Sequence, residues 1–157
     1  MNFAERFKIV PMGVALDMSG TVTTESVNCK DLHHGTIIFS FDALGGAAST
    51  LTVSSGATDA AVTSPLTFRY AYGSAAILAA TSDVLGATST SASLTLTAAT
   101  FTDRMLIVDV DMSEMDLDNG EEWLTCTVTT GAGTGLVTIV GIFEGRYPGN
   151  QSKTVTA

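Results

Sequence analysis

Apolar and polar residues alternate at every second position in one segment of this chain after another. In the segment 124–129, for example, Leu, Cys and Val alternate with three Thr residues. Successive side chains of a β-strand point to opposite faces of the sheet, so this alternation predicts strands with one buried face. The pattern occurs in the segments 37–41, 50–54, 66–72, 94–97, 105–112 and 124–129.

Short runs of Gly, Pro, Asn and Ser separate these segments and predict tight turns. Examples are Gly45-Gly46, Ser64-Pro65, Asn119-Gly120 and the Gly131–Gly135 run. The 157 residues are the length of one domain, and a hydrophobic fraction of 45% is enough to build a core. We therefore predict an all-β fold, an antiparallel β-sandwich of about seven or eight strands, with a single domain over residues 1–157.

The last predicted strand, 136–143, is apolar on both faces. Strands of this kind lie in the middle of a sheet and are covered on both sides. We therefore expect a second layer or another subunit to cover its outer face.

Two terminal segments look like arms that extend from the sandwich: an N-terminal arm of about residues 1–12 and a C-terminal tail of about 146–157. The N-terminal segment holds apolar residues without a local partner, which predicts contact with another protein or subunit through Phe3, Phe7 and Ile9. The alternative is that this segment is the first strand of the sandwich. At the other end, Arg146 and Tyr147 would anchor a contact by ion pairing and stacking, or would simply clamp the C-terminus to the core.

Acidic residues dominate the charge of the chain, which is −9 overall. Half of the acidic residues lie between Asp103 and Glu122, and they predict an acidic surface at Asp109, Asp111, Asp116 and Asp118. Such a surface attracts a positively charged protein and repels anionic lipid; the alternative is a solvated edge that keeps the protein soluble. The seven basic residues are scattered, so we expect neither a nucleic-acid partner nor a membrane partner.

The sequence offers little for catalysis or for a cofactor. His33 and His34 are adjacent, so on a strand they point to opposite faces and make a poor metal pair. The Asp116–Gly120 run matches a calcium loop only in part, and no phosphate-binding loop or nucleophile elbow is present. We expect no enzyme activity, no cofactor and no metal. Cys29 and Cys126 are expected to be buried free thiols, and the mixed charge of the first residues favours synthesis in a cytoplasm over secretion.

Three stretches of the chain resemble small structural proteins of tailed bacteriophages. They are Pro65–Tyr70, then the region from Ile107 to Cys126 with its Val-Asp strand and Met-Asp-Leu-Asp-Asn-Gly-Glu turn, and finally Gly145-Arg146-Tyr147-Pro148. The likeness runs from about Phe3 to Pro148. Its motifs are short and include no catalytic residues.

The resemblance implies a capsid cement or decoration protein with a jelly-roll-like sandwich. Such a protein would bind the major capsid protein on the outer surface of the head, would form a homotrimer, and would be made in the host cytoplasm before it joins the virion. A second possibility is a phage tail or surface module, a glycan-binding sandwich that stacks sugar rings on Trp123 and the tyrosines of an aromatic set, which comprises Phe68, Tyr70, Tyr72, Trp123 and Tyr147. A third is a tail-tube or baseplate subunit.

Overall fold

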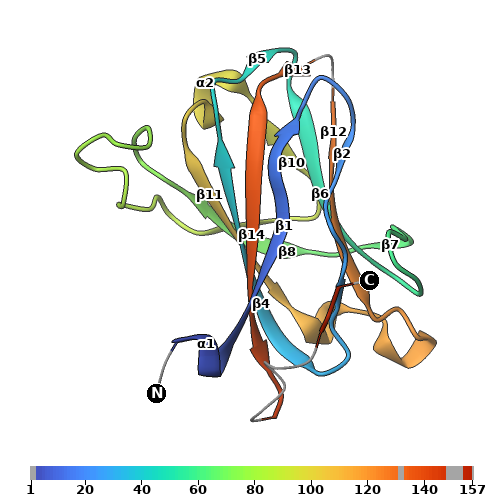
Figure 1. The fold of residues 1–157 in the computed structure, drawn as a ribbon. Helices are drawn as coiled ribbons and strands as arrows, with labels where there is room; N and C mark the ends of the chain where they lie inside the picture. The colour runs from blue at the N-terminus through green and yellow to red at the C-terminus, as the bar shows by residue number, and fades with distance from the viewer. Residues whose placement is uncertain (1–2, 131–132, 148–153, 157) are drawn as a thin grey trace.

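The computed structural model describes residues 3–130, 133–147 and 154–156. In these ranges most regular structure is β-strand (Figure 1). The helical elements are short: α1 (Phe3–Arg6), α2 (Ala98–Phe101), and the 3-10 turns η1 (Met112–Glu114) and η2 (Leu117–Asn119).

One large sheet, which we call sheet A, has the strand order β1-β14-β4-β11-β8-β9 within the described residues. All of its neighbouring strands pair antiparallel. The bounds of its strands are β1 (Phe7–Asp17), β4 (Leu32–Phe41), β8 (Phe68–Tyr72), β9 (Ser89–Ser91), β11 (Met105–Asp111) and β14 (Leu136–Gly145). The strand that is apolar on both faces, β14, lies between β1 and β4, which confirms its predicted central position.

The second sheet, sheet B, has the order β10-β6-β12-β2, with β3 also paired to β12 and β7 to β6, among the residues described. Its strands are β2 (Val22–Thr23), β3 (Val27–Asn28), β6 (Ser49–Gly56), β7 (Ser64–Pro65), β10 (Leu94–Leu96) and β12 (Trp123–Thr129). A separate small pair joins β5 (Gly45–Gly46) to β13 (Gly133–Thr134). The predicted Gly131–Gly135 turn lies partly outside the described residues.

The chain crosses between the two sheets after nearly every strand. It passes from β1 to β2 and β3, then to β4, β6, β10, β11, β12 and β14. Each step changes sheet except the one from β6 to β10, which are both in sheet B and are separated in the chain by β7, β8 and β9. The resulting neighbours are β1-β14-β4-β11 in one sheet and β2-β12-β6-β10 in the other. This double Greek key is the jelly-roll arrangement. The predicted all-β antiparallel sandwich is therefore confirmed, and β8 and β9 are additions that widen sheet A.

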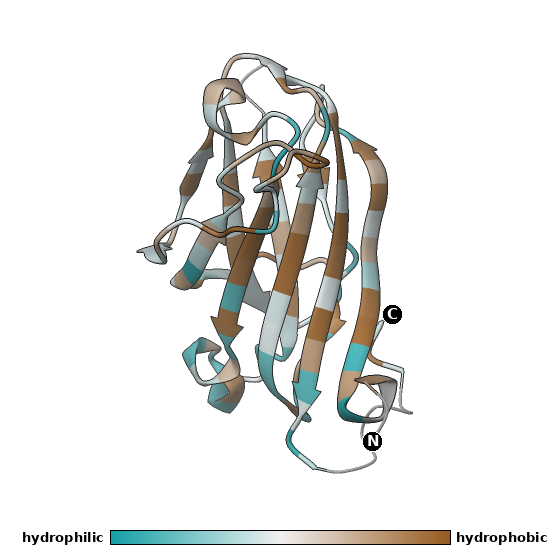
Figure 2. Cartoon of the chain, turned by 90° about the vertical axis from the view of Figure 1, so that its left-hand side faces the viewer, coloured by the Kyte–Doolittle hydropathy of each residue, from teal (hydrophilic) through white to brown (hydrophobic). Residues whose placement is uncertain are grey.

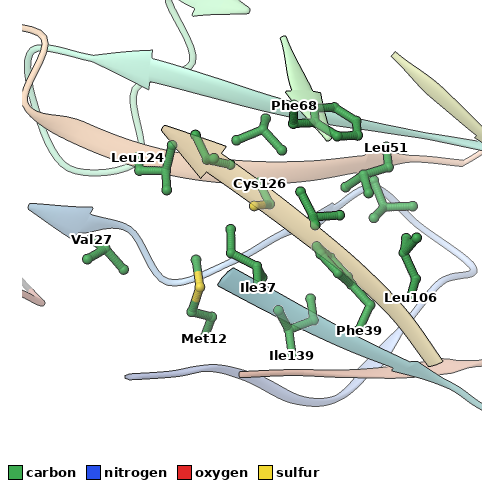
Figure 3. Close-up of a cluster of buried hydrophobic side chains, with 14 of the residues drawn as sticks. Met12, Val27, Ile37, Phe39, Leu51, Phe68, Leu106, Leu124, Cys126 and Ile139 are labelled. Carbon is green, nitrogen blue, oxygen red and sulfur yellow. The ribbon is translucent and has the colours of Figure 1, made fainter. Parts of the chain in front are cut away.

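The inner faces of the two sheets share one hydrophobic core (Figure 3). Alternate residues of β4 and β11 point inward from sheet A, and alternate residues of β6 and β12 point inward from sheet B. Burying one such Leu, Ile or Phe side chain stabilises the fold by roughly 1.5–3 kcal/mol. The largest fully buried side chains are Phe39, Phe68, Phe143, Met12, Met18, Leu32, Ile37, Leu51, Leu96, Leu106, Met112 and Leu124.

The N-terminal segment corrects one prediction. Residues 7–12 are not an arm, because they form the first half of β1 and pair with β14 from Phe7 opposite Glu144 to Pro11 opposite Val140. Val10 and Met12 point into the core and are buried. The structure therefore agrees with the alternative, a first strand that joins the sandwich, and leaves only α1 before it in the described part of the proposed arm.

The described part of the C-terminal tail also contacts the sandwich. The carbonyl oxygen of Val155 accepts a hydrogen bond from the amide of Asn28 in β3 at 2.7 Å, and Val155 packs against the core. Residues 148–153 and 157 of the predicted tail lie outside the described residues.

The ring of Phe143 lies where two glycines face it from β14 and β4. A Cβ atom added at Gly141 would overlap this ring and lie 2.9 Å from the sulfur of Met12, and one added at Gly35 would lie 2.6 Å from the ring. The close packing of sheet A therefore depends on the absence of side chains at these two positions.

We predict that Gly141→Ala lowers the free energy of unfolding by about 1–3 kcal/mol, because the added methyl group forces the ring of Phe143 to move in a packed core. Urea denaturation followed by circular dichroism measures the change. Gly20→Ala is the matched control, since a Cβ atom there meets nothing within 4 Å. A Gly141→Ala variant as stable as the wild type would contradict this packing.

Both cysteines are free and buried, as the sequence predicted. Burial raises the pKa of Cys126 to about 12, and burial together with the nearby Cys126 raises the pKa of Cys29. The thiolate is the reactive form, so both thiols should be inert in the folded protein. We expect a thiol-reactive dye to label neither cysteine in native protein at mildly alkaline pH and to label both after unfolding. Rapid labelling of the native protein would contradict the burial.

Candidate interaction surfaces

Three of the four residues of the predicted acidic surface lie at one end of the sandwich, and the fourth, Asp109, lies two residues before Asp111 on β11. Asp109 and Asp111 lie on the outer face of β11 near its end, and Asp116 and Asp118 lie in the turns that follow. Asp111, Asp116 and Asp118 are exposed, whereas Asp109 is half-buried. The last residue of β11 and the turns between β11 and β12 therefore form an exposed acidic end, which we define by Asp111, Glu114, Asp116 and Asp118.

Local hydrogen bonds hold the acidic end in shape. The carboxylate of Asp111 caps η1 and accepts bonds from the amide of Ser113 at 2.9 Å and from its hydroxyl at 2.8 Å. These two bonds, with smaller contributions from His33 and His34, hold the pKa of Asp111 below its ordinary value. In the next turn, Asn119 donates to the carboxylate of Asp116 at 2.7 Å, and Gly120 adopts the left-handed conformation with φ of 79° that ends the turn.

Asp109 differs from the other three because it is half-buried and bonded to a residue of the neighbouring strand. Its carboxylate accepts a bond from the hydroxyl of Thr36 at 2.6 Å and lies 3.6 Å from Nε2 of His34. Arg69 lies opposite Asp109 in the pairing of β8 with β11. We therefore assign Asp109 to the outer face of sheet A and not to the acidic end.

The residues predicted for contact near the N-terminus gather beside β1. Phe3 is 54% exposed, and its ring lies 4.7 Å from that of Phe7. Arg6 lies 5.1 Å over the ring of Phe7 and forms an ion pair with Glu144 of β14 at 3.2 Å. Ile9 follows on the outer face of the same strand and is 48% exposed. Phe3, Phe7 and Ile9 thus lie along one edge of sheet A.

Arg146 and Tyr147 have different surroundings: Arg146 is bonded to the neighbouring strand, whereas the ring of Tyr147 is exposed. The amide of Arg146 donates to the carbonyl of Asp31 at 2.8 Å, and its Nε donates to the carbonyl of Leu32 at 3.1 Å. Arg146 therefore fastens the end of β14 to the start of β4, which agrees with the clamp alternative. Tyr147 is 64% exposed and borders an open groove of about 670 Å³ that His33 and Glu144 also line.

The outer face of sheet A carries an apolar stripe that the sequence analysis did not assign as a site. Figure 2 views the sandwich from the side of this face, where β11, β4, β14 and β1 lie next to one another. Residues that are opposite one another in the strand registers form the stripe, and all of them are half-buried or exposed: Ile9, Pro11, Ile38, Ile107, Val140 and Ile142. The sequence does contain a signal for this stripe. Ile38 and Ile107 occupy positions where the alternation predicts a polar residue, and β14 is apolar on both faces.

The outer face of sheet B has the opposite character. Its central strands β6 and β12 present Ser and Thr. Other parts of the chain cover some of this face, since the buried hydroxyl of Thr125 pairs with that of Ser26 at 2.7 Å and Ser26 accepts a bond from the amide of Ala60 at 2.9 Å.

A buried polar network lies on the other side of sheet B. The hydroxyls of Ser55 and Ser64 both bond to the buried carboxylate of Glu121, at 2.6 and 3.1 Å. Ser55 continues the row of the inward-facing Leu51 and Val53 at every second position of β6, so this network lies on the core side of sheet B and not on its outer face.

The aromatic residues considered for sugar binding do not form one platform. Phe68 is buried in the core, and Tyr70 and Tyr72 pack against it from β8. Trp123 lies on β12 of the other sheet and is half-buried. Tyr147 alone of these five side chains is described as exposed, at the groove beside Arg146.

A second open groove, of about 510 Å³, lies at the opposite end of sheet A from Tyr147. Ile77 and Leu78, in the segment between β8 and β9, form one wall, and Ser40 and Thr138 belong to the sheet below. Among the described residues, no three His, Cys, Asp or Glu side chains lie close enough together to hold a metal ion. The described helices are too short to cross a membrane.

No family model matches this chain, and no curated protein matches it. Among solved structures, it is similar to the crystal structure of SPBc2 prophage-derived protein YomS, with 14% identity over 87% of this chain and 91% of that chain and a TM-score of 0.48. It is also similar to a chain in the structure of infectious bursal disease virus Gx strain, with 13% identity, 97% and 43% coverage, and a TM-score of 0.18. Neither likeness is close enough to carry an argument about this chain.

We predict that Asp111→Ala lowers the free energy of unfolding by at most about 1 kcal/mol at neutral pH, because it removes the cap of η1 at an exposed position. The native state lowers the pKa of Asp111, so this stabilisation is present above the ordinary pKa of an aspartate and disappears as the pH falls through the lowered value. Urea denaturation of both proteins at neutral and at strongly acidic pH measures the difference. Ser113→Ala should show a smaller effect, and a difference that persists in acid would contradict this role.

Proposed function

We propose that this protein is a non-enzymatic viral structural protein, a capsid cement or decoration protein of a tailed bacteriophage. It binds the major capsid protein on the outer surface of the head and stabilises the shell. It is made in the host cytoplasm, associates with itself as a homotrimer and ends in the virion.

The observation that carries this proposal is the jelly-roll topology, with the eight framework strands of the described residues in the order β1-β14-β4-β11 and β2-β12-β6-β10. Jelly rolls are frequent in viral capsid proteins and in lectins. The resemblance of the Val-Asp strand, the acidic turn and the Arg-Tyr ending to phage structural proteins favours the first of these classes. The two outer faces and the acidic end offer surfaces for protein partners on a rigid frame.

The acidic end gives the proposed contact with the shell a physical basis. Asp111, Glu114, Asp116 and Asp118 are exposed in short turns that hydrogen bonds hold in place, so their charges are presented in a fixed arrangement. A basic patch on the capsid surface would complement them and would accelerate binding at low salt. Several copies joined in one oligomer would bind more strongly than one copy, because linked sites raise the effective concentration.

Localisation in the virion tests the proposal most directly. We expect cryo-electron microscopy of the phage that encodes this chain to show the protein on the outside of mature heads, near three-fold or quasi-three-fold axes. Heads that lack the protein should lose DNA at a lower temperature, and adding the purified protein back should restore them. A variant with Asp116 and Asp118 changed to Asn should bind such heads more weakly and with less dependence on salt. Finding the protein in the tail, or absent from purified virions, would overturn the proposal.

One observation favours the second candidate function, a glycan-binding module. Tyr147 is 64% exposed at an open groove that also contains Arg146, Glu144 and His33, and an aromatic ring beside polar groups is a common arrangement for stacking a sugar. A glycan array decides between the two functions. Binding that Tyr147→Ala abolishes would support the glycan module, and an array without binding would leave the capsid proposal.

A further inference from the structure

The apolar stripe consists mostly of branched apolar side chains on the outer face of sheet A, where the other sheet of this protein has Ser and Thr. Ile38 and Ile107 lie opposite each other in the register of β4 with β11, and Val140 lies opposite Ile38 from β14. Ile9 and Ile142 form the next opposed pair and extend the stripe to the edge strand β1. Four adjacent strands therefore contribute β-branched side chains to one surface, as they do to the inner faces that pack in the core.

The comparison with sheet B shows that this composition is specific to one face. At matching central positions sheet B presents Thr52 and Thr127, which are opposite each other in β6 and β12 and are half-buried like Val140. Val and Thr have nearly the same shape, and they differ in the methyl group that replaces a hydroxyl. The outer face of sheet A is therefore apolar where the outer face of sheet B is hydrophilic, although both are built from β-branched residues.

The distribution of charge indicates what kind of partner fits the stripe. The six residues of the stripe are uncharged, and the acids on its border have local partners: Glu144 forms an ion pair with Arg6, and Asp109 accepts a hydrogen bond from Thr36. The exposed acids of the acidic end lie at the last residue of β11 and in the turns that follow it. A basic partner would be drawn to that end, whereas a second copy of this chain, with its charge of −9, meets little like-charge repulsion at the stripe.

A flat stripe of this kind is also complementary to itself. Sheets pack face to face at a separation of about 10 Å when both faces carry branched apolar side chains. Three copies around a three-fold axis can turn their stripes toward that axis, so that the same rows of Ile and Val from each copy meet there.

We infer that the apolar stripe on the outer face of sheet A is the contact through which copies of this chain bind one another. The inference assigns a surface to the self-association expected under the proposed function. It does not depend on the role in the capsid, because it concerns the purified protein alone.

The experiment measures the mass of the purified full-length protein by native mass spectrometry and light scattering over a range of concentrations. We expect an oligomer that dissociates on dilution. Val140→Arg places an unpaired charge in the middle of the contact and should raise the dissociation constant about 30-fold or more. Ile9→Arg tests the same contact at the exposed edge of the stripe, where a long side chain has room and folding is not disturbed. Val140→Thr should also raise the dissociation constant, but by a smaller factor.

Thr52→Arg is the matched control, because Thr52 is a half-buried β-branched residue at a central position of the other sheet. It should leave the mass unchanged, and circular dichroism should show that all variants are folded. A wild-type protein that is monomeric at every concentration would overturn the inference. So would an oligomer that Val140→Arg and Ile9→Arg leave intact, and that result would still allow self-association through another surface.

The dependence on salt separates this contact from the proposed contact with the shell. Added salt screens the repulsion between two acidic copies and strengthens apolar association, so the oligomer should become tighter. Binding to heads through the acidic end should become weaker under the same change. An oligomer that salt dissociates would contradict a contact made by the stripe.

Discussion

The structure depends on the packing of two sheets against each other through residues that alternate along every main strand. Ile37 and Phe39 in β4 meet Leu51 in β6 and Leu124 in β12 across a shared core, and β14 joins the core through Ile139 and Phe143. Because one face of each strand is committed to this core, the register of each strand is fixed, and so is the set of side chains that the other face presents. The surfaces of the protein therefore follow from the same alternation that builds its interior.

The outer faces of the two sheets differ in composition and in what covers them. The outer face of sheet B is covered in part by the chain itself, through Ser26, which pairs with the buried Thr125 and accepts a bond from the amide of Ala60. Sheet A presents Ile38, Ile107, Val140 and Ile142 on its outside, and the acidic end lies at the last residue of β11 and in the turns that follow it. The apolar face and the acidic end are therefore separate surfaces, and we propose the first for a copy of the chain and the second for a basic partner.

The sequence predicted the architecture well because period-two alternation is a local signal. It indicated the strands 37–41, 105–112 and 124–129, the central position of β14 and the burial of both cysteines. It failed at β1, because Pro11 and Gly13 interrupt the pattern where the register of the strand shifts, and the segment therefore resembled an arm. It also missed the apolar stripe, since Ile38 and Ile107 become neighbours only when β4 and β11 pair, and that pairing is not a local property.

The central claim is that the outer face of sheet A is covered by protein when the chain is assembled. Carbene footprinting read by mass spectrometry measures this directly, because the reagent labels exposed aliphatic side chains in proportion to their accessibility. The account predicts that labelling of Ile38, Val140 and Ile142 falls strongly between dilute and concentrated protein, while labelling of the exposed Thr95 on β10 does not change. Equal labelling of the stripe in both samples, at a concentration where the protein is oligomeric, would contradict the account.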